Sequence, residues 1–165
     1  MSNHPAPSSR SGFTLVEILV VVVILGIIAA IAVPNMVRGS DMQIVAGARM
    51  IASDLEYAQN LAITSQTPVT VTFDPVHDAY SLSDAGGTLT HPITKDPYTW
   101  SRATGRGMNQ LDIVSAAFGG SSAVTFDEYG TPDNAGQVVL QAGPHVYRIE
   151  IGGGTGKISV RIGAS

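Results

Sequence analysis

The chain has 165 residues, enough for one domain of ordinary size, with 44% apolar and only 13% charged residues. An average soluble domain carries about 25% charged residues, and much of the deficit here falls in one stretch near the N-terminus. The formal net charge of −4 argues against a general nucleic-acid coat, which needs an excess of Lys and Arg. The absence of cysteine excludes disulfides, thiol catalysis and cysteine-bound zinc, but it does not identify a compartment.

An abrupt change in composition separates the first residues from an apolar stretch. Residues 1–12 are polar and rich in Pro and Ser, and we expect them to be disordered. Residues 13–33 carry one charge, Glu17, and as a helix they would be about 31 Å long, which matches a bilayer core of about 30 Å. Three interpretations compete: a signal peptide cleaved at Ala30-Ile31-Ala32, a plain signal anchor, or a leader removed ahead of the apolar run.

The start of the apolar stretch distinguishes these interpretations. Gly12-Phe13-Thr14-Leu15-Val16-Glu17 resembles the cleavage and methylation motif of type IV pilins and type II secretion pseudopilins. An acid at the centre of a membrane helix costs roughly 3 kcal/mol and has no use in a signal or an anchor. The simpler alternative is that the helix dipole favours Glu17 near the N-terminus. The resemblance implies cleavage between Gly12 and Phe13, N-methylation of Phe13, and pairing of Glu17 with a neighbouring subunit's Phe13 amine.

Two further positions, Gly26 and Pro34, fall where related pilins carry Gly and Pro when positions are counted from Phe13. Proline removes a helical hydrogen bond and clashes with the preceding turn, and glycine lowers helix stability by about 1 kcal/mol relative to alanine. The segment between them is either a soft section that unwinds in a filament or a simple kink where the helix leaves the membrane.

An amphipathic pattern continues the helix after Pro34. Apolar residues recur at steps of three and four along one face, namely Ile44, Ala48, Ile51, Leu55, Ala58 and Ala62. Thr67-Pro68 ends the pattern, so we predict one helix from Phe13 to about Ser65. The apolar face is short and contains small alanines, which favours packing on a sheet over a coiled-coil seam.

The remaining residues, 67–165, are predicted to form strands and turns. The strand candidates are 69–73, 79–82, 111–114, 124–126, 138–140, 146–151 and 157–162, with Gly152–Gly156 connecting the last two. Residues 84–110 lack a period and are expected to form a long, partly ordered loop. The predicted fold class is α+β, with one long N-terminal helix packed on a C-terminal antiparallel sheet. The domains expected are a leader (1–12), a transmembrane and filament-core helix (13–34), its amphipathic continuation (35–66) and a globular domain (67–165).

No segment predicts catalysis, a cofactor or a metal site. Gly152–Lys157 lacks the residues required of a phosphate loop. The four histidines, His4, His77, His91 and His145, are scattered and show no metal spacing. Asp127, Glu128 and Asp133 fit turn formation better than calcium binding. We therefore expect no enzyme, no cofactor and no metal.

The whole layout resembles minor pseudopilins and minor pilins of the GspH/FimT type. The resemblance is carried by Asp54–Ile63, Pro68–Val71, Phe126–Gly130 and Ile149–Val160. It implies a structural minor pseudopilin of a type II secretion system, held in the inner membrane by one span, with its globular domain on the periplasmic side, and then assembled into a pseudopilus. The partners implied are other pseudopilins or pilins, the prepilin peptidase, the inner-membrane assembly platform and membrane lipid.

The alternative from a different functional class is a type IV minor pilin for pilus assembly or DNA uptake. DNA binding requires a basic patch, and the candidates are Arg148, Lys157 and Arg161, of which Arg148 and Arg161 share a face only if the strand register allows it. Loss of Arg10 with the leader leaves eight basic residues against 13 acidic ones, so no nucleic acid is expected as a partner.

Overall fold

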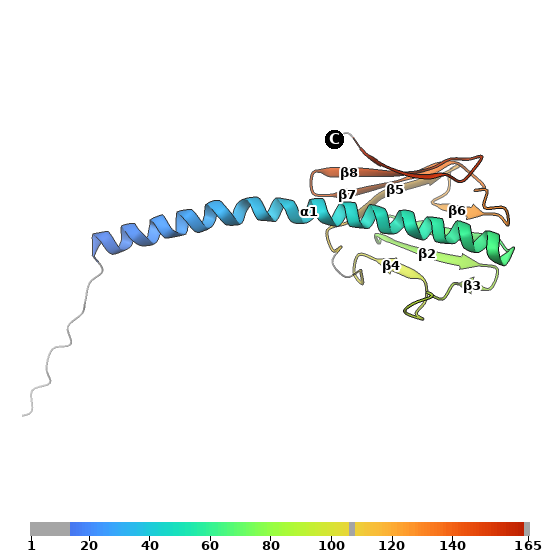
Figure 1. Ribbon diagram of the computed structural model, residues 1–165, viewed down its shortest axis with the longest axis horizontal. Coiled ribbons are helices and arrows are strands. Elements are labelled where there is room, and N and C mark those ends of the chain that lie inside the picture. Colours follow the sequence, from blue (N-terminus) through green and yellow to red (C-terminus); the bar gives the residue numbers. More distant parts are fainter. Residues whose placement is uncertain (1–13, 106–107, 164–165) are drawn as a thin grey trace, which may run out of the picture. The chain divides into compact units, whose positions relative to one another are not determined.

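The computed structural model describes residues 14–105 and 108–163, except for the side chains of residues 29–41 (Figure 1). It contains one long helix, α1 (Leu15–Ser65), followed by strands. The strands are β1 (Val69–Asp74), β2 (Ala79–Asp84), β3 (Gly87–Thr88), β4 (Thr99–Ser101), β5 (Asp112–Phe118), β6 (Ala123–Phe126), β7 (Gly136–Ala142), β8 (His145–Ile151) and β9 (Ile158–Ile162). The predicted leader, including its expected disorder, and Phe13 lie outside the described residues. The chain divides within α1 into two units, residues 1–37 and residues 38–165.

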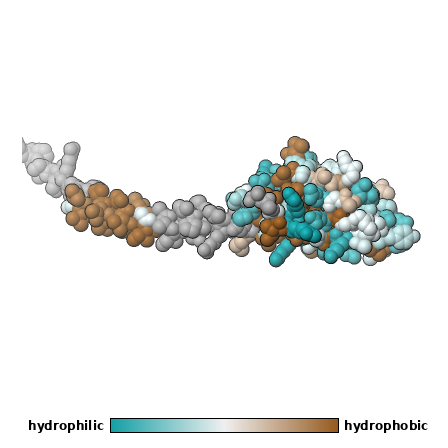
Figure 2. Space-filling model, turned by 90° about the horizontal axis from the view of Figure 1, so that it is seen from above, coloured by the Kyte–Doolittle hydropathy of each residue, from teal (hydrophilic) through white to brown (hydrophobic). Residues whose placement is uncertain are grey.

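The first unit contains the apolar half of α1. All large apolar side chains between Leu15 and Ile28 are exposed, by 47% to 81% of their surface, and Figure 2 shows them as a continuous brown surface. Within the described part of the chain, no helix has the length and hydropathy needed to cross a membrane. The side chains of residues 29–33, which complete the predicted span, are not among those described.

The second unit contains two antiparallel sheets, where the sequence analysis expected one. The first has the order β3-β2-β1-β6, with β4 also paired to β2, and the second has the order β5-β7-β8-β9. The strands do not follow chain order because β6 pairs with β1, placing Val69 opposite Phe126, while β5 pairs with β7. The predicted connection at Gly152–Gly156 joins β8 to β9. The predicted α+β class, with a long helix on antiparallel strands, is confirmed.

The second half of α1 packs against both sheets through the predicted apolar face. Its six residues, Ile44, Ala48, Ile51, Leu55, Ala58 and Ala62, are each no more than 1% exposed. They share one core with residues of both sheets, such as Phe73 in β1 and Ile149 in β8. Figure 1 shows α1 running between the strands labelled β7 and β8 and the strands labelled β2 and β4. Burial of this face supplies a hydrophobic driving force that aligns the helix with the sheets.

The segment predicted as a loop, residues 84–110, contains β3 and β4 as well as a bridge between Thr90 and Pro97. Strand β4 pairs with β2 so that Trp100 lies opposite Tyr80. A strand of three residues is too short to show an alternating pattern, which is why the sequence did not indicate it. This strand matters because it places Trp100 beside α1.

Candidate functional site

The N-terminal motif begins, in the described residues, with a helix cap. Thr14 precedes the first helical residue, and the backbone N–H of Glu17 lies 3.2 Å from the Thr14 Oγ1 that accepts its hydrogen bond. Thr-x-x-Glu is the spacing of a capping box, in which the threonine satisfies a backbone donor at the start of the helix. The sequence analysis considered the helix dipole at Glu17 but missed this cap. Gly12 lies outside the described residues, so cleavage and methylation remain predictions, as does the pairing of Glu17.

The two predicted flexibility positions, Gly26 and Pro34, both lie within α1, which is helical throughout its length. A Cβ added to Gly26 would meet no atom within 4 Å, so packing within this chain does not require glycine there. The side chain of Pro34 is not among those described. The soft section and the simple kink therefore both remain open predictions.

Side-chain hydrogen bonds hold α1 to two loops of the second unit. The Gln59 side-chain amide donates to the carbonyl oxygen of Gly130 at 2.7 Å and to that of Thr155 at 3.3 Å. Gly156 has φ of +63°, and a Cβ there would collide with Gln59. The helical, turn and hairpin segments that carry the subfamily resemblance therefore meet at Gln59. Their shared role here is structural.

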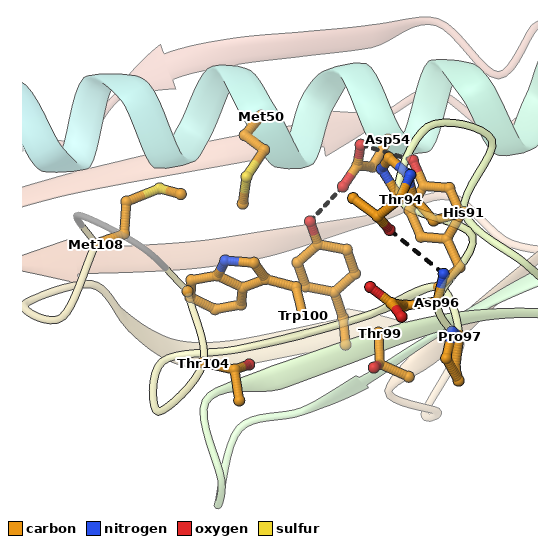
Figure 3. A pocket seen from close by; sticks show the side chains of 13 residues that line it. Met50, Asp54, His91, Thr94, Asp96, Pro97, Thr99, Trp100, Thr104 and Met108 are labelled. Atoms are coloured by element: carbon orange, nitrogen blue, oxygen red, sulfur yellow. Dashed lines mark hydrogen bonds between the residues drawn. The ribbon is translucent and has the colours of Figure 1, made fainter.

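A cavity of about 540 Å³ lies beside α1, lined by the helix, by β2 and β4, and by the segment around them. Figure 3 shows Met50 and Asp54 extending from α1 into the space that Trp100 and Met108 also line. The lining residues are Met50, Asp54, Tyr80, His91, Thr94, Asp96, Pro97, Tyr98, Thr99, Trp100, Thr104, Gly105 and Met108. This cavity brings together residues that are up to 58 positions apart in the sequence, from Met50 to Met108.

Asp54 is the best-connected acid of the cavity. Its carboxylate accepts hydrogen bonds from the Tyr80 hydroxyl and, at 3.0 Å, from the Tyr98 hydroxyl. Partial burial raises the pKa of Asp54 above its ordinary value, while the two hydroxyls and the nearby His91 oppose that rise. Burial and the neighbouring carboxylate raise the pKa of both tyrosines, so they remain protonated donors at neutral pH.

Aromatic rings form much of the cavity wall. Tyr80 and Trp100 stack with ring centroids 5.7 Å apart, and His91 lies 4.6 Å from Tyr98. Trp100 Nε1 is buried and, among the described residues, has no hydrogen-bond partner. Gly105 lies directly against this nitrogen, and a Cβ there would clash with the indole. The cavity therefore combines aromatic faces, a held carboxylate and a tightly seated indole.

Two of the three acids considered for calcium, Asp127 and Asp133, accept hydrogen bonds from the backbone of their turn. Asp127 accepts hydrogen bonds from the backbone N–H groups of Tyr129 and Thr131, and Asp133 accepts from those of Thr125 and Asn134. Within the described ranges, no three residues of the metal-ligating types come together. His77 Nδ1 lies 2.6 Å from a carboxylate oxygen of Asp74.

The register of the last two strands resolves the arrangement of the candidate basic residues. Arg148 of β8 lies directly opposite Arg161 of β9, so both occupy the exposed face of the sheet. Arg161 Nε lies 2.9 Å from a carboxylate oxygen of Glu150 on the same face. Lys157 precedes β9 in the hairpin loop. The face therefore carries two arginines and an acid that pairs with one of them.

Two family profiles match the chain. The prokaryotic N-terminal methylation motif covers residues 7–33, and the type II transport protein GspH covers residues 47–156. The second match extends over most of the chain and includes the core face of α1 from Ala48 onwards, the cavity and both loops at Gln59. The chain belongs to the GspH family. Both predicted resemblances, to the N-terminal cleavage and methylation motif and to the GspH type, are thus confirmed.

Solved structures with the same fold agree with the GspH assignment. The minor pseudopilin EpsH of the Vibrio cholerae type II secretion system matches with a TM-score of 0.54 and 13% identity, over 73% of this chain and 94% of that one. The type IV minor pilin FimU of Pseudomonas aeruginosa matches with a TM-score of 0.50 and 15% identity, over 70% of this chain and 86% of that one. No curated protein sequence matches the chain.

The two family matches establish a coarse role. The chain is a pilin-like structural subunit and not an enzyme, as predicted. Family membership implies processing of the N-terminus and assembly with other pilin-like subunits.

Proposed function

We propose that this GspH-family protein is a minor pseudopilin of a type II secretion system. The observation that carries the proposal is the presence, in one chain, of the methylation motif at residues 7–33 and the GspH domain at residues 47–156. The first supplies a site for a prepilin peptidase, and the second is a family described by type II transport. The work of the protein is assembly against the inner-membrane platform, without chemistry in this chain.

The exposed apolar half of α1 supports membrane anchoring before assembly. A continuous surface of large apolar side chains from Leu15 to Ile28 is costly in water and is relieved by lipid or by neighbouring helices. In this proposal residues 1–12 are removed, residues 13–34 anchor the chain in lipid and then form the filament core, residues 35–66 continue the helix, and residues 67–165 lie on the periplasmic side.

In this proposal Glu17 acts during assembly of the filament. Cleavage after Gly12 creates a new amine on Phe13, which is then methylated and lies in the membrane next to neighbouring helices. The exposed Glu17 carboxylate of one subunit pairs with that amine on another. Leaving one member of a buried ion pair alone costs about 3–5 kcal/mol, although the intact pair contributes little net stability. Glu17 therefore determines how the helix of an entering subunit aligns with the helices of its neighbours. The segment from Gly26 to Pro34 adapts the shape of the helix to those neighbours.

Deletion of the gene tests the choice between secretion and pilus assembly. We expect exported proteins to accumulate in the periplasm while surface pili and DNA uptake stay normal, and we expect the wild-type gene to restore export. The variant Gly12→Val, which blocks cleavage by adding bulk at the junction, should fail to restore export although its globular domain is unchanged. Normal export together with lost piliation would refute the type II assignment.

One observation supports a second candidate, a minor pilin that binds DNA. Like charges directly opposite each other destabilise a strand pair, yet Arg148 and Arg161 occupy such positions. A phosphate backbone would relieve that repulsion, although Glu150 already relieves part of it. A salt-dependent DNA mobility shift that is lost in Arg148→Gln, and kept in a matched Lys157→Gln control, would support this candidate.

A further inference from the structure

Strand β9 forms an open edge of the second sheet. Within the described residues, its one strand neighbour is β8. The Gly163 N–H donates to the carbonyl oxygen of Val146 at the end of this pairing, so in an antiparallel ladder every second residue back from Gly163 bonds to β8. The residues between them direct their backbone N–H and C=O groups towards the open edge, and they are Ile158, Val160 and Ile162. Such a row of unpaired groups is a template for a further strand.

The other margins of the two sheets, as far as they are described, are protected. Strands β3 and β4 have only two and three residues, and β5 contains a bulge between Ile113 and Ser115. The loop after β6 covers the edge of that strand, because Asp133 N–H donates to the Thr125 carbonyl oxygen and Thr125 N–H donates to the Asp133 carboxylate. Short, bulged or covered edges resist pairing with other chains. In contrast, β9 has five residues in unbroken register with β8.

The side chains of β9 divide into an apolar face and a basic face. Three apolar residues lie on the core side of the sheet, opposite Ile151, Ile149 and Tyr147 of β8, and they are Ile158, Val160 and Ile162. Despite this orientation, Val160 is 38% exposed and Ile162 is 76% exposed. By alternation the opposite face carries Lys157, Ser159 and Arg161. A strand added beside β9 would therefore meet apolar side chains on one face and two cations on the other.

We propose that β9 accepts an antiparallel strand from a partner protein, in which apolar residues alternate with acids at both ends. The expected pattern is acid, apolar, any residue, apolar, acid, so that the acids lie opposite Lys157 and Arg161. Backbone hydrogen bonds supply affinity in this mode of binding, and alternate side chains supply specificity. The proposal goes beyond the proposed function and does not depend on it, since the edge is the same in a secretion filament and in a pilus.

The charges on the outer face argue against a second copy of this chain as the occupant. Arg148 and Arg161 already lie opposite each other, and Glu150 pairs with Arg161. Pairing of two β9 strands would bring a second Arg161 to the same face, and like charges on neighbouring strands are destabilising. A partner strand with acids at these positions instead relieves the repulsion.

A labelled peptide tests both parts of the proposal. The full-length protein in a nonionic detergent is titrated into fluorescein-labelled Glu-Val-Thr-Val-Glu, and fluorescence anisotropy should rise to saturation. Replacing both glutamates of the peptide with glutamine should weaken binding severalfold. N-methylation of the first valine, whose N–H faces β9, should abolish binding. The same methyl group on the threonine, whose N–H faces away from β9, should leave binding unchanged and is the matched control.

Variants of the protein test the edge from the other side. Val160→Pro removes an N–H that points to the open edge and not to β8, so the sheet should remain folded while peptide binding is lost. Val160→Thr keeps that N–H and should keep binding. Arg161→Gln should weaken binding severalfold, whereas Arg148→Gln, one strand further from the edge, should have a smaller effect. Thermal unfolding confirms that each variant remains folded.

The outcomes separate strand addition from its alternatives. No binding of the acidic peptide, or unchanged affinity in folded Val160→Pro, would overturn the proposal. Equal binding of the two N-methylated peptides would mean that the arginines attract acids without strand addition, as a DNA-binding face would, and would also overturn it. A dimer of the full-length protein that is lost in Val160→Pro would assign the edge to a second copy and refute the partner named here. None of these results bears on the secretion phenotype that tests the proposed function.

Discussion

Replacing Ile51 tests whether the apolar face of α1 is the core of the second unit. Its side chain is completely buried. Ile51→Ala removes three carbons, worth about 2.4 kcal/mol at about 0.8 kcal/mol each, and the remaining cavity raises the loss to roughly 3–4 kcal/mol. For a domain of this size that corresponds to a fall in Tm of about 10–15 °C. Ile51→Asp adds the cost of burying a carboxylate and should abolish cooperative unfolding.

The assay is thermal unfolding of residues 38–165, which form a compact unit and are expected to fold without the apolar half of the helix. Met42→Ala is the matched control, because Met42 lies on the same helix but is 75% exposed, and its Tm should stay within a few degrees of wild type. An unchanged Tm for Ile51→Asp would refute the reasoning, since it would mean that this face is open in solution and reserved for neighbouring subunits.

Three further predictions follow from particular contacts and charges. Gly156→Ala should lower stability by more than 1 kcal/mol because of its left-handed φ and close neighbours, whereas Gly154→Ala, which has open space, should change it little, as chemical denaturation will show. Burial raises the pKa of Asp54 in the folded state above its value in the unfolded chain. The folded state therefore binds the proton more tightly, and the free energy of unfolding rises as the pH falls through that pKa. Asp54→Asn lacks this gain, and its stability relative to wild type should therefore decline from pH 7 towards pH 4 in denaturation curves. Glu17→Val should still be inserted and cut, but should be missing from the assembled pseudopilus fraction because the amine of a neighbouring Phe13 loses its partner; normal recovery there would leave Glu17 only a role at the helix N-terminus.

Local patterns in the sequence predicted the helix and its buried face. The steps of three and four from Ile44 to Ala62 depend only on helical geometry, and all six residues of the face are buried. The end of the helix near Ser65 follows equally locally from the proline at position 68. The N-terminal motif was also recognisable because its residues are contiguous, and the match at residues 7–33 confirms that family assignment.

Long-range pairing explains what the sequence did not show. The division into two sheets depends on β6 pairing with β1 across more than 50 residues, and no local pattern encodes that choice. The role of Asp54 was not predicted, because its partners Tyr80 and Tyr98 lie 26 and 44 positions further along the chain. Trp100 lies in a segment whose hydrophobic residues show neither helical nor strand periodicity, so its position was not predicted. The cavity could therefore be identified only in the folded structure.

The intact mass of the protein extracted from membranes tests the central claim most directly. A prepilin-type subunit should begin at Phe13, with the mass of residues 13–165 plus one methyl group, and the mass should return to that of the uncut chain in Gly12→Val. A mature chain that begins at Val33 would mean that a signal peptidase removes the apolar stretch, and it would contradict both the anchoring of the protein and its assembly through Glu17.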